Sequence, residues 1–135
     1  NMLRYADPFN EILVPWDTEL PGRQRDLVVI NLGINDTNVI NSSEGAYSYE
    51  QFREDYIRLI QEVRTLYPDS YILCTDISAS AAQEQKAVEE YIARTGDANI
   101  SFWLRNTVYS RHPLISTHQS EGKMLVRELE DLGIF

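Results

Sequence analysis

The sequence predicts an α/β fold in which helices cover both faces of a parallel β-sheet. Three short apolar runs, at 26–32, 71–75 and 99–104, alternate with three helical patterns. A continuous β-branched or aromatic run is typical of a strand that is buried on both faces. Strands that alternate with helices form parallel sheets through right-handed crossovers. We therefore expect a three-layer α/β/α arrangement.

The length of the chain predicts a single domain. It has 135 residues, of which 43% are hydrophobic and 24% are charged. This length suits one hydrophobic core, so we expect one domain over 1–135. Residues 1–25 contain three of the five prolines and have no helical period. We interpret them as an irregular lead-in to a folded part at 26–135.

Composition argues against several classes of partner and cofactor. Twelve Lys and Arg residues against 21 Asp and Glu residues give a net charge of −9. Nucleic acids and anionic membranes repel such a chain, and no apolar run reaches the ~18 residues of a membrane span. One Cys and two His are too few for a structural zinc site, and no Gly-rich phosphate loop is present. We therefore expect no nucleic acid, no membrane, no metal and no cofactor.

The first two helices are predicted from their caps and apolar spacing. Ser48–Gln51 is a capping box, and the helix that it opens must end before Pro68. Glu54 and Arg58 have the spacing of an i,i+4 ion pair on the exposed face. A weaker amphipathic pattern predicts the second helix over 81–94.

The last helix is predicted from a second capping box. Ser116–Gln119 marks its start, and Gly133 lies just past its end. His118 would then lie on the apolar face with Leu125 and Leu129, and a structural role is favoured for it.

The loop after the first strand is the first candidate for chemistry. In open α/β sheets, ligands bind beyond the carboxyl ends of the strands. That loop contains Gly33, Asn35 and Asp36. Glycine permits a sharp turn, and the Asn35 amide is a neutral donor that can face a developing negative charge. Asn and Asp are also ordinary turn residues, and spacing alone favours a plain turn.

The loop before the last helix is the second candidate. It places His112 immediately before Pro113. A neutral imidazole at this position could act as a general base near pH 7. A surface histidine without a catalytic role is the alternative, and it is favoured when the residue is taken alone.

Taken together, the two loops resemble those of the SGNH, or GDSL, hydrolases. The strand that runs into Gly33, Asn35 and Asp36 is similar to the Gly-x-Asn-Asp block of that family. His112 matches the family's histidine before proline, which precedes the last helix. The resemblance implies that His112 is the general base, that Asn35 donates to the oxyanion, and that Gly33 and Asp36 shape the loop.

The resemblance is closest to carbohydrate esterases of family 2, which are acetyl esterases of plant polysaccharides. Their Trp-Asp pair is matched at 16–17, and their His-Pro-x-x-x-Thr-His segment at 112–118. The resemblance implies part of a flavodoxin-like fold and a substrate that is an acetylated carbohydrate or another small ester. Enzymes of this family are often exported, and the sequence opens without a signal-peptide pattern.

The chain departs from the family at the nucleophile. The family's Gly-Asp-Ser block and oxyanion glycine lie upstream of Gly-x-Asn-Asp, yet the 32 residues before Gly33 contain no serine. Ser70 lies at the start of a predicted strand, which is the wrong end for catalysis. Ser42 and Ser43 lack the strand-turn-helix setting. We therefore expect the nucleophile to lie outside this chain, and the chain alone to be inactive.

A second departure concerns the acid of the triad. Ser110 and Tyr109 stand where the family has an aspartate before His112. Neither side chain can stabilise an imidazolium as a carboxylate does. Two interpretations stay open: a backbone carbonyl orients His112 in a Ser-His dyad, or the site is degenerate.

The sequence thus predicts the carboxyl-terminal fragment of an SGNH-type esterase. A non-catalytic α/β module that binds a ligand or partner at the same strand ends is the alternative. In the family's sheet, the nucleophile strand lies beside the strand that corresponds to 27–32. Without that neighbour, 27–32 becomes a free apolar edge, and we expect a homodimer through it unless residues 1–25 cover it.

Overall fold

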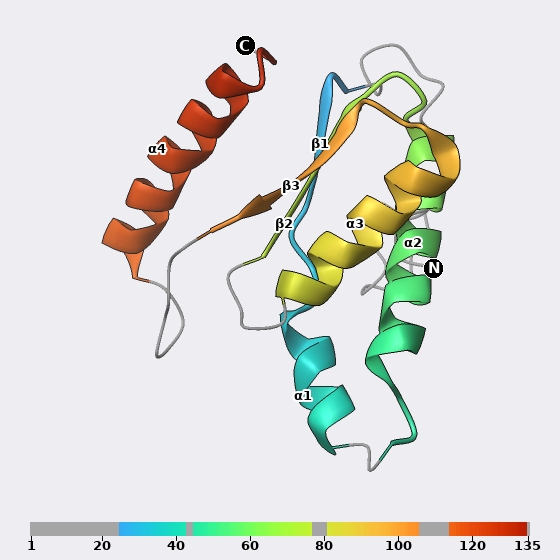
Figure 1. Ribbon diagram of the computed structural model, residues 1–135. Coiled ribbons are helices and arrows are strands. Elements are labelled where there is room, and N and C mark those ends of the chain that lie inside the picture. Colours follow the sequence, from blue (N-terminus) through green and yellow to red (C-terminus); the bar gives the residue numbers. More distant parts are fainter. Residues whose placement is uncertain (1–24, 43–44, 77–80, 106–113, 135) are drawn as a thin grey trace, which may run out of the picture.

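The predicted α/β class is confirmed. The computed structural model describes residues 25–42, 45–76, 81–105 and 114–134. Its elements are, in order, β1 (Leu27–Ile30), α1 (Ile34–Ser42), α2 (Tyr49–Leu66), β2 (Tyr71–Asp76), α3 (Ala81–Thr95), β3 (Ile100–Leu104) and α4 (Ile115–Asp131). The three strands are parallel in the order β1-β2-β3. Helices α2 and α3 lie on one side of the sheet and α4 lies on the other (Figure 1).

Burial differs between the central and outer strands. β2 is buried at every residue except Tyr71, as a strand with neighbours on both sides should be. The prediction that the first strand is buried on both faces is wrong. β1 pairs only with β2 among the described strands, and Val29 keeps 41% of its surface exposed. β3 is also only partly buried beyond Ile100.

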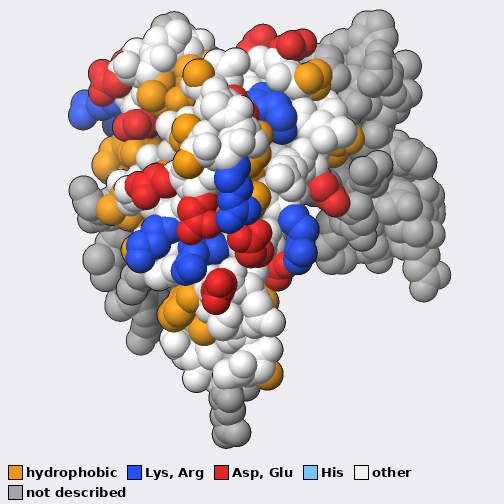
Figure 2. All heavy atoms as spheres, turned by 45° about the vertical axis from the view of Figure 1, so that its right-hand side comes forward, with side chains coloured by type: hydrophobic (Ala, Val, Ile, Leu, Met, Phe, Trp, Pro, Cys, Tyr) orange, Lys and Arg blue, Asp and Glu red, His pale blue; other side chains and the backbone are white. Residues whose placement is uncertain are grey.

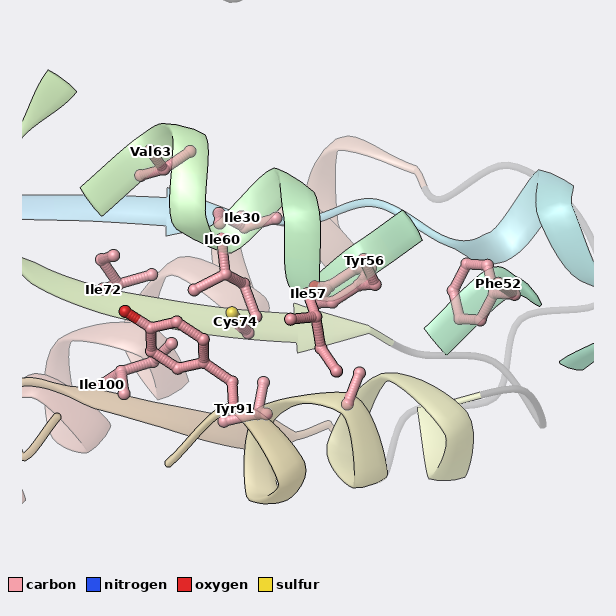
Figure 3. Close-up of a cluster of buried hydrophobic side chains, with 12 residues drawn as sticks. Ile30, Phe52, Tyr56, Ile57, Ile60, Val63, Ile72, Cys74, Tyr91 and Ile100 are labelled. Carbon is pink, nitrogen blue, oxygen red and sulfur yellow. The ribbon is translucent and has the colours of Figure 1, made fainter. Parts of the chain in front are cut away.

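The core lies between the sheet and helices α2 and α3. Alternate strand residues, including Ile30, Ile72 and Cys74, point toward Ile60 of α2 (Figure 3). Fully burying one such side chain contributes about 1.5–3 kcal/mol. Phe52 lies at the end of this cluster nearest α1 (Figure 3). The core therefore extends to the carboxyl end of β1, where the first candidate loop begins.

The capping box of α2 is confirmed. The Gln51 amide donates to Ser48 Oγ at 3.2 Å, and the Ser48 amide donates to Gln51 Oε1 at 2.8 Å. The helix ends at Leu66, before Pro68. These two signals act within a few residues of each other, which is why the sequence alone predicts this helix well.

Glu54 and Arg58 attract each other as predicted, since Arg94 lowers the pKa of Glu54 and the charge of Arg58 lowers it further, but each forms its ion pair with another residue. Arg58 pairs with Asp55 one turn earlier on α2, whereas Glu54 binds Arg94 of α3, with an N–O distance of 2.7 Å. Glu54 thus reaches across the helix pair rather than along its own helix. Figure 2 shows basic and acidic side chains intermingled on this side of the molecule.

Arg64 holds together the amino ends of β2 and β3. Its guanidinium binds Asp97 with an N–O distance of 2.8 Å and donates to the carbonyls of Ser70 and Asn99 at 2.6 and 3.0 Å. Ser70 is buried here, and its hydroxyl donates to the Arg25 carbonyl. Ser70 therefore lies at the end of the sheet opposite the candidate loops, as predicted.

One helix was not predicted, and another begins earlier than predicted. Residues 34–42 form α1, where a loop was expected. α4 begins at Ile115 after Leu114, so the predicted capping box at Ser116–Gln119 is wrong. The Leu114 carbonyl already accepts the amide of His118 at 3.0 Å, which starts the helix earlier. His118 is exposed, although it lies on the same face of α4 as Leu125 and Leu129, as predicted.

Within the described segments, none of the helices has the length and apolar character needed to cross a membrane.

Candidate functional site

The carboxyl ends of the three strands meet at one edge of the sheet. Arg105 follows β3 directly, and its guanidinium donates to Asn31 Oδ1 and to Glu121 Oε2, each at 2.7 Å. Its amide donates to the Asp76 carbonyl at the end of β2, at 3.4 Å. Arg105 therefore joins the exits of all three strands to α4. Sequence analysis did not single out this residue, because its partners are distant along the chain.

The first candidate loop leaves β1 at this edge. Gly33 is buried and has a φ of +132°, which L side chains rarely adopt. The Asp36 amide donates to the Gly33 carbonyl at 2.9 Å. The plain turn favoured by spacing is wrong, because Asn35 and Asp36 lie in the first turn of α1. Asn35 is exposed there, at the helix end where a negative charge is favoured.

A pocket of about 410 Å³ lies beside this loop. It lies between the β1 exit and α2 and is lined by residues 31–36 together with Tyr47, Phe52, Asp55, Tyr56 and Leu59. The Tyr47 hydroxyl donates to Asp55 Oδ2 at 3.0 Å. Burial raises the pKa of Tyr47, and the charge on Asp36 raises it further. The pocket lining thus combines aromatic residues and two carboxyl groups with Asn35.

A pair of buried carboxyl groups lies beneath the loop. Asp76 ends β2 and is 2% exposed, and Glu84 on α3 is fully buried. Burial, with a smaller contribution from the neighbouring Asp76, raises the pKa of Glu84 to about 8. Both residues were missed in the sequence. For Glu84 a signal was present, because it shares the buried face of α3 with Ala81 and Val88.

Cys74, Ser42 and Ser70 are described residues that could be nucleophiles by their chemistry, but none of the three is activated. Burial raises the pKa of the Cys74 thiol to about 12, so it stays protonated at neutral pH and is a poor nucleophile. The Ser42 hydroxyl donates to the Asn38 carbonyl at 2.8 Å within α1. Ser70 is at the opposite end of the sheet.

Several predicted site residues fall outside the described part of the chain. They include His112, Pro113, Ser110, Tyr109 and Ser43. The segment with His112 nevertheless connects two described positions, Arg105 and Leu114. Among the described residues, no group of three or more His, Cys, Asp or Glu side chains is placed to hold a metal ion.

Comparison with known proteins gives a match in structure. No protein-family model matches the sequence, and the curated proteins give no significant match. A family two carbohydrate esterase from Clostridium thermocellum, solved in complex with cellohexaose, is 28% identical with a TM-score of 0.73. That match covers 98% of this chain and 43% of the esterase. An active-site mutant of a family two esterase from the same organism is 26% identical with a TM-score of 0.75, covering 98% and 42%.

An acetyl xylan esterase from the rumen bacterium Butyrivibrio proteoclasticus has the same fold. It is 22% identical with a TM-score of 0.70, and the match covers 83% of this chain and 38% of the esterase. The predicted resemblance to family-2 carbohydrate esterases is therefore confirmed in structure. The chain spans about two fifths of the length of these proteins.

Proposed function

We propose that this chain is the carboxyl-terminal part of an SGNH-type esterase that removes acetyl groups from a carbohydrate. The observation that carries the proposal is the match of 98% of the chain to a family two carbohydrate esterase at 28% identity. The position of Asn35 at the carboxyl end of β1 supports it. The nucleophilic serine lies on an upstream segment. We call this chain joined to that upstream segment the parent protein. We propose that the two form one domain, of which residues 26–135 are the carboxyl-terminal part.

The proposed reaction is acyl transfer to serine. The serine Oγ bonds to the carbonyl carbon of the acetyl ester while His112 takes the hydroxyl proton. The negative charge that develops on the carbonyl oxygen accepts a hydrogen bond from the Asn35 amide. The carbon–oxygen bond to the sugar then breaks, and His112 returns the proton to the leaving alcohol. Water repeats these steps on the acetyl-serine and releases acetate. No cofactor or metal takes part.

The surroundings of Asn35 support a carbohydrate as the alcohol. The pocket offers the half-buried side chains of Tyr47 and Leu59 as apolar surfaces, and the carboxyl groups of Asp36 and Asp55 as hydrogen-bond acceptors. Sugars present both apolar faces and hydroxyl donors, so the two kinds of lining suit them. Gly33 gives the loop its turn, and Asp36 anchors that turn through its amide.

Hydrolysis of an activated acetyl ester tests the proposal. The parent protein is expected to turn the ester over, whereas the 135-residue chain alone stays at background, because the proposed nucleophilic serine lies on the upstream segment. If the chain alone turns the ester over and His112→Ala abolishes that turnover, the proposal that the serine lies on the upstream segment is contradicted. A parent protein that binds cellohexaose but hydrolyses no ester favours the non-catalytic module instead.

We also propose that the isolated chain self-associates through the strand at 27–32. Val29 and Leu32 are 41% and 55% exposed, and unpaired backbone groups on an apolar edge recruit another strand. Light scattering at micromolar concentration is expected to give the mass of a dimer or a larger species. Val29→Lys should restore the monomer, whereas Val126→Lys, a matched control on α4, should not. A monomeric wild-type chain would contradict the proposal and favour cover by residues 1–25.

A further inference from the structure

We propose that Glu84 is a positioning residue of this site: its buried carboxyl group supports Gly33 and thereby fixes the turn that presents Asn35. This inference rests on the function proposed above for Asn35. It concerns two described residues, Gly33 after β1 and Glu84 on α3.

The contact between Glu84 and Gly33 is close. A Cβ atom built on Gly33 would overlap Glu84 Oε1 and would lie 2.9 Å from Cδ and 3.1 Å from Cγ. Real Cβ atoms do not approach other atoms so closely, so the carboxyl group fills the space that a larger residue would need. Gly33 is therefore held from below by a side chain of another element. Its φ of +132° independently requires glycine.

The supported turn leads directly to Asn35. The Gly33 carbonyl accepts the Asp36 amide at 2.9 Å, which closes the first turn of α1. A shift of Gly33 therefore moves the first turn of the helix, and with it the side-chain amide of Asn35. A misplacement of about 1 Å in a catalytic group can cost on the order of 10²-fold in rate.

Burial and the neighbouring side chains disfavour a charge on the Glu84 carboxyl group, whereas a hydrogen bond from its own backbone amide favours the charge. Glu84 interacts electrostatically with three acidic groups on other elements: Asp76 on β2, Asp36 on α1 and Tyr56 on α2. A hydrogen bond with the Asp76 side chain favours the protonated form of Glu84. Burial raises its pKa to about 8. At neutral pH the group is therefore protonated and can stay against Gly33 without repelling the two aspartates.

Ionisation should weaken this support at alkaline pH. The folded-state pKa of about 8 lies above the ordinary value of 4.5, so between these values the folded chain binds more protons than the unfolded chain. The stability that the protonated group contributes is complete below pH 4.5 and is lost as the pH rises through 8. Each pH unit in this range changes the folding equilibrium constant by up to about tenfold.

A double-mutant cycle on the 135-residue chain tests the contact without any activity. Gly33→Ala is expected to lower the folding equilibrium constant by about tenfold or more, because it adds both the overlap and the φ penalty. In the Glu84→Ala background the same substitution should cost clearly less, since only the φ penalty remains. An equal cost in both backgrounds would overturn the proposed contact.

Glu84→Gln tests the role of the proton and guards against the loss of folding in Glu84→Ala. The amide keeps the shape and cannot ionise, so the fall in stability between pH 5 and 8 should be smaller than in the wild type. Glu89→Gln removes an exposed carboxyl from the same helix and should keep the wild-type pH dependence. Identical pH profiles for Glu84→Gln and the wild type would contradict the account of Glu84.

Kinetics of the parent protein then test the positioning role. Glu84→Ala should lower kcat by about tenfold or more with little change in KM, and Glu84→Gln should restore most of that loss. The fall in kcat above pH 8 should be weaker in Glu84→Gln than in the wild type. An unchanged kcat in Glu84→Ala, or an equal loss in both variants, overturns the positioning role. A parent protein without esterase activity instead overturns the proposed function, while the folding cycle still decides whether the contact exists.

Discussion

Replacement of His112 by alanine in the parent protein is expected to lower kcat at pH 7 by about four to six orders of magnitude. The alanine variant has no group that can take the serine proton during attack or return it to the leaving alcohol. The free serine hydroxyl is a weak nucleophile, so the first step becomes very slow. Initial rates with an activated acetyl ester, measured under saturating substrate, give the loss directly.

The chain contains a matched control for this substitution. His118 is exposed on α4, six residues after His112 in the same segment of sequence. His118→Ala removes the same atoms and should leave kcat within about twofold, as is typical of exposed positions. Equal losses in the two variants would refute the assignment of His112 as the base.

The second large effect is expected at Asn35. Asn35→Ala in the parent protein should lower kcat by on the order of 10²–10³ while KM changes little. The amide is proposed to donate to an oxygen that becomes negative only in the transition state, so its loss should not weaken the binding of the ground state. The measurement is a full Michaelis–Menten curve on an acetyl ester for each variant.

Asn38→Ala is the matched control for Asn35→Ala. Asn38 is exposed on the same short helix, α1, one turn further from β1. Its replacement should leave both kinetic constants close to those of the wild type. If Asn35→Ala raises KM and keeps kcat, Asn35 contacts the substrate and does not stabilise the oxyanion.

The sequence predicted those elements whose signals are local. The apolar run at 71–75 became the buried strand β2, and the capping box at Ser48–Gln51 opened α2. α1 was not predicted, because its sequence is rich in Asn, Asp, Thr and Ser, which favour turns over helix interiors. Its Ile40 packs against the core cluster, a contact with residues of other elements that the local sequence does not reveal.

The candidate site was predicted only in part. The loop with Asn35 was found because Gly-x-Asn-Asp is a recognisable pattern at a strand end. The supports of that loop were not found. Glu84 and Arg105 are charged residues that would ordinarily be expected at the surface, and their contacts with Gly33 and Asn31 join segments far apart in the chain. The pairing of β1 and β3 with β2 on either side, and the packing of α3 against β2 and β3, bring them together.

Trapping of the acetyl intermediate tests the central claim most directly. The parent protein is mixed with an activated acetyl ester, quenched in acid during turnover, digested and mapped by mass spectrometry. The account predicts one acetylated serine on the upstream segment, with a longer-lived adduct in His112→Ala than in the wild type once it has formed. An acetylated residue within the 135-residue chain that accumulates and decays at the rate of turnover would contradict the account.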